Sequence, residues 1–84
     1  MPRFGINQQI PANTPTEVEW LGKNGELVVE STGTTTLERF GRTKYIQLAG
    51  ASIDGSGSLI FSTSATKLRV TSTATAEVVI SLLR

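Results

Sequence analysis

Short runs in which apolar residues alternate with polar ones follow one another along most of this chain, and turn residues separate them. In residues 16–21, for example, Val18 and Trp20 alternate with two glutamates, which is the period of a half-buried β-strand. No window has the three- and four-residue apolar spacing of an amphipathic helix. Similar runs cover residues 26–30, 34–40, 44–49, 58–63, 67–71 and 76–83. The pattern predicts an all-β fold of about seven short antiparallel strands, in a β-sandwich or a small barrel.

Glycine-containing segments mark the expected turns. Residues 22–25 include Asn24-Gly25, and Asn-Gly is the strongest short signal for a β-hairpin. We therefore expect a hairpin turn there, and further turns at 31–33, 41–43 and 50–57.

The alternation also predicts which side chains face the core. In residues 44–49 we expect Ile46 and Leu48 to point inward, while Tyr45 and Gln47 point outward. The run 59–61 (Leu-Ile-Phe) is apolar at every position, which is typical of a strand that is covered on both faces.

One string recurs three times. It reads LVVESTGT at 27–34, LIFSTSAT at 59–66 and LRVTSTAT at 68–75. Each copy begins with a strand-like triplet and continues into small hydroxylated residues, whose side chains bond local backbone in turns. Both an internal repeat and an all-β composition rich in Ser and Thr explain the recurrence. In either case we expect a strand anchored in the core, followed by a turn with a low-charge surface.

The first 15 residues differ from the rest of the chain. They hold all 3 prolines, and proline fixes φ and lacks a backbone donor, so neither a helix nor a central strand is expected. We predict an extended arm over residues 1–15 and a single β domain over 16–84. Phe4, Ile6 and Ile10 are the apolar side chains of this arm. It is either a frayed terminus or a segment that lies along a neighbouring subunit.

The small size of the domain favours self-association. An 84-residue chain has a small core, and domains of this size are commonly stabilised by disulfides, a metal or oligomerisation. The chain has 0 Cys and 0 His, which leaves oligomerisation or docking on a larger body. Residues 78–83 are apolar on both faces of the last strand, and one face therefore needs a partner. The predicted contact residues are Phe4, Ile6, Ile10, Val79 and Leu83.

Catalytic and cofactor chemistry is not indicated. The many Ser and Thr hydroxyls have no His as a base, no G-x-S-x-G motif is present, and the acidic residues are scattered. The chain is therefore predicted to be no enzyme, with no metal and no cofactor.

Two binding functions remain as alternatives. A single strand of nucleic acid would use the basic stretch with Arg39, Arg42, Lys44 and Tyr45, although a net charge of +1 disfavours it. A glycan or peptide would use an aromatic platform of Trp20 and Tyr45. A lone Trp in a strand is more often part of the core.

No apolar run reaches the roughly 20 residues of a membrane span, and the N-terminus has no apolar segment of signal-peptide length. No membrane partner is expected, and we expect synthesis in the cytoplasm.

In its overall composition and strand pattern, the whole chain resembles the small all-β proteins of tailed-bacteriophage virions, which decorate the head or form tail and adaptor parts. The resemblance is carried by the arm MPRFGINQQIPANTP, the strands TTTLERF and RVTSTATAEVV, the apolar end VVISLL, and the absence of Cys and His. It implies a β-sandwich or barrel, frequently trimeric, that clamps a capsid or tail by its arm and its flat faces. The implied location is the virion, or the cytoplasm if the protein is not viral.

Overall fold

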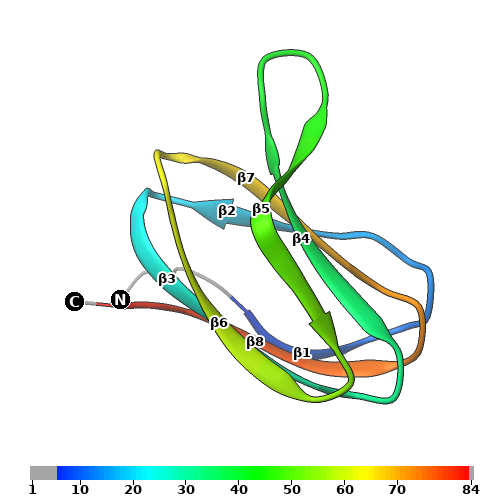
Figure 1. The fold of residues 1–84 in the computed structure, drawn as a ribbon. Coiled ribbons are helices and arrows are strands. Elements are labelled where there is room, and N and C mark those ends of the chain that lie inside the picture. Colours follow the sequence, from blue (N-terminus) through cyan, green and yellow to red (C-terminus); the bar gives the residue numbers. More distant parts are fainter. Residues whose placement is uncertain (1–5, 84) are drawn as a thin grey trace.

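The computed structural model describes residues 6–83 (Figure 1). The fold is all-β, as predicted, with eight strands in two antiparallel sheets that pack together. The strands are β1 (Ile6–Ile10), β2 (Thr16–Trp20), β3 (Lys23–Ser31), β4 (Thr34–Phe40), β5 (Tyr45–Asp54), β6 (Gly57–Thr63), β7 (Thr66–Ser72) and β8 (Ala76–Leu82). Residues 6–83 include no helix that is long and apolar enough to cross a membrane.

The strand order identifies the topology. Sheet A has the order β1-β8-β3-β6, and sheet B has the order β2-β7-β4-β5. Strands β1 and β8, β2 and β7, β3 and β6, and β4 and β5 therefore pair with each other. The chain is one long antiparallel hairpin, centred on the β4–β5 turn and rolled into two sheets. This arrangement is a jelly roll.

Within residues 6–83, only the β4–β5 connection joins neighbouring strands of one sheet. Its turn is closed by the Gly41 N–H, which donates to the Lys44 carbonyl at 2.7 Å. The prediction of a hairpin at 22–25 was wrong, because β2 and β3 belong to different sheets. The chain changes sheet at Gly22 (φ +100°) and Lys23 (φ +73°), and Gly25 lies within β3.

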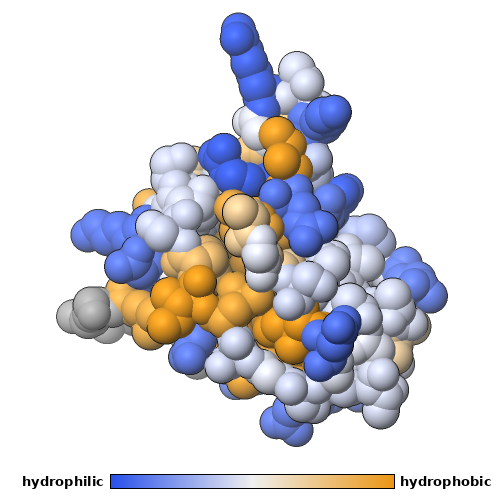
Figure 2. Space-filling view, viewed as in Figure 1, coloured by the Kyte–Doolittle hydropathy of each residue, from blue (hydrophilic) through white to orange (hydrophobic). Residues whose placement is uncertain are grey.

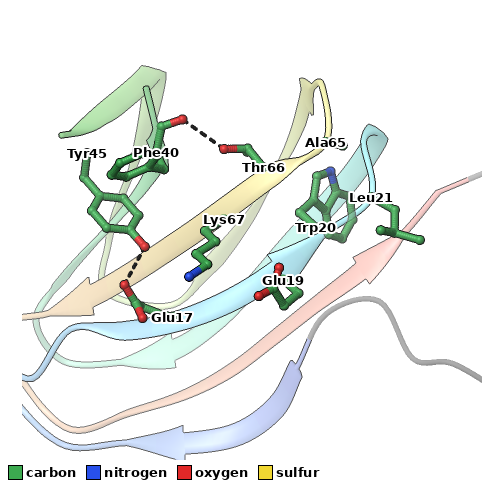
Figure 3. A pocket seen from close by; sticks show the side chains of 9 residues that line it. All are labelled: Glu17, Glu19, Trp20, Leu21, Phe40, Tyr45, Ala65, Thr66 and Lys67. Atoms are coloured by element: carbon green, nitrogen blue, oxygen red, sulfur yellow. Dashed lines mark hydrogen bonds between the residues drawn. The ribbon is translucent and has the colours of Figure 1, made fainter. Parts of the chain in front are cut away.

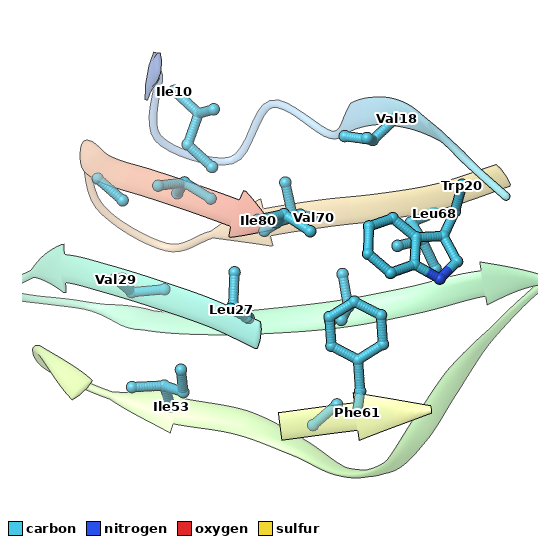
Figure 4. Packing of buried hydrophobic residues seen from close by; sticks show 14 residues of the cluster. Ile10, Val18, Trp20, Leu27, Val29, Ile53, Phe61, Leu68, Val70 and Ile80 are labelled. Carbon is cyan, nitrogen blue, oxygen red and sulfur yellow. The ribbon is translucent and has the colours of Figure 1, made fainter. Parts of the chain in front are cut away.

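The core lies between the sheets (Figure 4). Trp20 is 1% exposed and its ring packs on Phe61, with centroids 5.1 Å apart at a tilt of 51°. This confirms the prediction that Trp20 belongs to the core. Burying each large apolar side chain contributes about 1.5–3 kcal/mol. The core residues are Ile10, Val18, Trp20, Leu27, Val29, Leu37, Ala51, Ile53, Phe61, Leu68, Val70, Ala76, Val78 and Ile80.

The first half of β5 faces the two sides of sheet B as predicted, but the core does not cover all of its inward side chains. Ile46 lies opposite Arg39, which lies opposite the buried Leu68, so Ile46 is on the inner face. Ile46 is 51% exposed and Leu48 is only partly buried, whereas Ala51 and Ile53 face the core. Ile46 is exposed because it lies on the hairpin that extends beyond the core (Figure 1).

The register shift between Gln47 and Ser52 then changes the alternation, so that Ala51 and Ile53 point inward. Gly50, at φ +71°, lies in the extra length of β5 and changes which side chains point inward. Beyond it, the β4–β5 hairpin projects past the rest of the molecule (Figure 1).

The segment expected to be an arm contributes an edge strand. β1 pairs with β8 along its whole length, from Ile6 opposite Ile80 to Ile10 opposite Ala76. Ile10 is fully buried in the core, and Ile6 packs against the core from its edge. Ile10 is therefore not available for contact with a partner. Phe4 lies outside the described residues.

The tails of two of the three recurring strings meet at one end of the molecule. The Ser31 hydroxyl lies 3.5 Å from the Ser72 hydroxyl and donates to the Thr75 carbonyl at 3.3 Å. The Thr34 N–H donates to the Thr73 hydroxyl at 2.9 Å, and the Thr73 N–H donates to the Thr34 carbonyl at 3.0 Å. Hydroxyls also bond local backbone in both turns, as predicted, since the Gly33 N–H donates to the Ser31 hydroxyl at 3.0 Å and the Ala74 N–H donates to the Ser72 hydroxyl at 3.4 Å. The Ser31 and Thr73 hydroxyls reach across to the other turn as well. They link two connections that are far apart in sequence.

Candidate functional site

The two sheets leave an open flank where β5 and β6, the edge strands of sheets B and A, lie side by side. The two strands separate from the turn that joins them, so the flank widens toward the projecting hairpin (Figure 1). A groove of about 340 Å³ lies between them, which we call the β5–β6 groove. It is lined by Leu48, Ala49, Gly50, Ala51, Leu59, Ile60, Phe61 and Ser62.

Large apolar side chains are exposed in this groove and elsewhere on the surface. Ile60, at the centre of β6, is 69% exposed, and Ile46 of β5 is 51% exposed. Leu82, at the end of β8, is 37% exposed. Figure 2 shows hydrophobic residues gathered over this side of the molecule, near β6 and the end of β8. The prediction that 59–61 is covered on both faces was wrong for Ile60, because its side chain points to the outer face of sheet A.

The outer face of sheet A also carries two of the predicted contact residues, Val79 and Leu83. Val79 of β8 is half-buried and lies opposite Val28 of β3 in the ladder. Leu83 follows the end of β8, and its N–H donates to the Asn24 carbonyl at 2.9 Å. Val79 and Leu83 are therefore placed at the surface, as a contact role requires, whereas Ile10 is not.

Sequence reasoning missed Ile60 and Ile46 as surface residues. A signal for Ile60 was present, because no charged residue occurs between Asp54 and Lys67. Exposed edge strands usually carry charges, most often Lys, that prevent pairing with other chains. An edge strand in an uncharged stretch is therefore a candidate contact surface.

A second groove, of about 460 Å³, lies on the outer face of sheet B (Figure 3). We call it the sheet-B groove. Its apolar part includes Leu21, which is 62% exposed, and its charged part includes carboxylates from β2 and an amine from β7. It is lined by Glu17, Glu19, Trp20, Leu21, Phe40, Tyr45, Ala65, Thr66 and Lys67.

Tyr45 is held firmly at one side of the sheet-B groove. Its hydroxyl donates to Glu17 Oε2 at 2.6 Å, and its ring meets Phe40 edge-on at 5.4 Å between centroids. The Arg69 guanidinium carbon lies 4.2 Å from the Tyr45 ring centroid, which is a cation–π contact. Burial and the hydrogen bond to Glu17 raise the pKa of Tyr45 to about 12, since both favour the neutral phenol.

Arg69 is itself held in place across the sheet. Its Nε donates to Glu38 Oε1 at 2.9 Å. The hydrogen bond to Glu38 raises the pKa of Arg69, so the residue stays charged. One face of the Tyr45 ring is therefore covered by the protein's own guanidinium.

The four residues predicted to bind nucleic acid in the alternative function lie in different surroundings. Arg42 and Lys44 are exposed at the tip of the projecting hairpin. Arg39 is half-buried, and its Nη2 donates to the Ser64 hydroxyl at 3.4 Å. Tyr45 is engaged by Glu17 and Arg69. The four residues do not form one open basic and aromatic surface, and Trp20 is too deeply buried to form a platform with Tyr45.

No group of three or more Asp and Glu side chains that would suit a metal ion occurs within residues 6–83.

Comparisons with known proteins do not place the chain in a family. Models of protein families, curated proteins and solved structures were each compared with the chain, and none matched. The function proposed for this chain therefore rests on the exposed surface of the domain.

Proposed function

We propose that this chain is a non-enzymatic structural protein that self-associates and docks on, or stabilises, a larger assembly. The observation that carries the proposal is Ile60. A large aliphatic side chain that is 69% exposed lies at the centre of an edge strand, in the β5–β6 groove. Contact with another protein removes this surface from water, which is favourable by about 25 cal/mol for each Å² of apolar area.

The character of the surrounding surface supports the same function. Ser and Thr side chains flank Ile60 along β6, and they lose little conformational entropy when a partner packs on them. Charged side chains, which are costly to desolvate, are absent from residues 55–66. This flank therefore suits a contact between proteins better than contact with water.

A phage particle is the assembly that we propose, as a capsid decoration protein or a tail component. The proposal comes from the sequence resemblance to virion proteins, and it places the protein in the virion. The jelly roll gives general support, since viral capsid domains are among the proteins that use it. Lectins and enzymes use it as well, so the fold by itself does not select the function.

The proposal is tested on particles produced from the genome that encodes the chain. Particles are purified by density gradient, and the protein is quantified by mass spectrometry against the major coat protein. We expect a fixed ratio of this chain to coat protein that survives repeated purification. If the chain is expressed but remains in the fractions without particles, the virion proposal is wrong.

A further inference from the structure

The free edge of β6 has the features of a strand that pairs with another strand. Within residues 6–83, β6 pairs only with β3 in its sheet. Every second residue of an edge strand directs its backbone N–H and C=O away from the sheet, where they are open to a new partner. The side chains of β6 include no charge, and Ile60 is exposed at its centre.

The other three edges are less suited to pairing with a copy of themselves. In β2, an antiparallel pair centred on Val18 would place Glu17 opposite Glu19 of the copy, and like charges opposite each other are destabilising. β5 is interrupted by the register shift near Gly50. β1 has five residues and is followed at once by Pro11, which cannot donate to a ladder.

We propose that β6 pairs antiparallel with β6 of a second copy, around a two-fold axis at Ile60. The segment Ser58-Leu59-Ile60-Phe61-Ser62 has the same chemical character in both directions. Antiparallel pairing about its centre places Ile60 opposite Ile60, Leu59 opposite Phe61 and Ser58 opposite Ser62. Each pair joins side chains of like polarity and none joins like charges, as an isologous interface requires.

The pairing also agrees with the two faces of the strand. Phe61 is buried and Leu59 is half-buried, so this pair lies on the inner side of the sheet, along the β5–β6 groove. Ile60 and the two serines lie on the outer face. The two copies of sheet A would form one continuous sheet, in which the exposed Ile60 side chains cover each other. This contact rests on the proposed function, because it names the surface through which the protein self-associates.

The size of the contact predicts its strength. A seven-residue strand is roughly 23 Å long at about 3.3 Å per residue, and the molecule is 21 Å thick along its shortest axis. The contact therefore covers roughly 500 Å² per copy, which is less than the 800 Å² or so of a standard interface. We expect a dimer that dissociates at micromolar concentrations. This two-fold contact makes a dimer, and does not itself make the trimer that the resemblance implies.

Single-cysteine variants test the register directly, since the chain has 0 Cys. Ile60→Cys, Ser58→Cys and Ser62→Cys are each oxidised mildly and run on a non-reducing gel. Residues that face each other across an antiparallel ladder have Cα atoms about 4.5–5.5 Å apart, within the range of a disulfide. The two copies of residue 58 would be about 13 Å apart, four residues along the strand. We expect at least tenfold faster cross-linking of Ile60→Cys than of either serine variant alone. A mixture of Ser58→Cys and Ser62→Cys should form the mixed dimer.

Ile60→Lys provides a second and independent test, with Ile60→Thr as the matched control. Ile60 is mostly exposed, so neither change should disturb the fold, which circular dichroism verifies. We expect Ile60→Lys to weaken dimerisation at least tenfold and Ile60→Thr to weaken it less, because two lysines would face each other only in the first variant. Equal cross-linking at 58, 60 and 62, or an oligomer unchanged by Ile60→Lys, overturns the β6 contact but leaves self-association standing. A wild-type monomer at millimolar concentration overturns the β6 contact as well as self-association.

Discussion

Gly25 packs directly against Trp20. A β-carbon at position 25 would lie 2.6 Å from Cζ2 of Trp20 and 2.4 Å from Cζ of Phe61, closer than real contacts allow. Gly25 is thus required by the packing of two aromatic rings in the core. The turn between β2 and β3 is made instead by Gly22 and Lys23.

We predict that Gly25→Ala destabilises the domain by about 1–3 kcal/mol, because the added methyl must displace rings that are fully packed. Urea unfolding followed by fluorescence measures the change, and Trp20 is the sole tryptophan of the chain. Gly50→Ala is the matched control. A β-carbon there meets nothing within 4 Å, so only the strain of its positive φ, about 1 kcal/mol, is expected. A Gly25→Ala domain as stable as the wild type would contradict the packing described here.

Substitutions at the turn residues Gly22 and Lys23 should change the stability of the domain in opposite directions. Lys23 has a φ of +73°, and a side chain in this left-handed region costs roughly 1 kcal/mol. Lys23→Gly is therefore expected to stabilise the domain by a few tenths to about 1 kcal/mol, after the entropy that glycine adds to the unfolded chain. Gly22→Ala is expected to destabilise it by more than 1 kcal/mol, since φ is +100° and the new β-carbon would lie 3.0 Å from the Ala65 nitrogen. Thermal unfolding of both variants measures these changes in stability. Two changes of the same sign would exclude the turn geometry described above.

Tyr45 is the sole tyrosine, so the ultraviolet absorbance of tyrosinate reports its ionisation directly. We expect the folded protein to titrate near the raised pKa of about 12 and the unfolded protein near the ordinary 10.0. Since the folded pKa is raised, this contribution to stability is complete below pH 10 and is lost as the pH rises from 10 to 12. Tyr45→Phe has no phenolic hydroxyl to ionise, so it should remove this loss of stability at high pH. Glu17→Gln should lower the pKa of Tyr45, and an unchanged midpoint in this variant would argue against the hydrogen bond to Glu17.

If the alternative function were correct, the chain would bind single-stranded nucleic acid. The side-chain contacts of Tyr45 and Arg39 disfavour such binding. Because Arg69 covers one face of Tyr45 and Arg39 is half-buried, we expect no saturable binding of fluorescently labelled single-stranded DNA at low salt. Fluorescence anisotropy measures this. Binding that weakens with added salt and is lost in the double variant Arg42→Ser, Lys44→Ser would revive the alternative and weigh against the structural function.

Alternation along the chain was sufficient to predict the fold class and much of the core. Val18, Trp20, Leu68 and Val70 all face inward as their spacing indicated. Alternation is a local property, however, and it does not determine which strands pair. The glycine at 25 was therefore taken for part of a turn, because a glycine required for space and one required for a turn look the same in sequence.

The candidate site was less predictable for a related reason. Ile60 was expected to be covered because its neighbours are apolar, but coverage depends on the position of β6 at the edge of its sheet. Ile10 was expected at the surface because it lies between prolines, yet β1 pairs with β8 and places it in the core. In both cases long-range pairing, which the local pattern does not contain, determined the exposure.

Sedimentation equilibrium of the wild type and of Ile60→Lys, from about 1 µM to about 1 mM, tests self-association through β6 most directly. We predict that the wild-type mass rises with concentration from that of a monomer toward twice that value, and that Ile60→Lys shifts the rise to at least tenfold higher concentration. A wild-type mass that stays at the monomer value over the whole range would contradict the account.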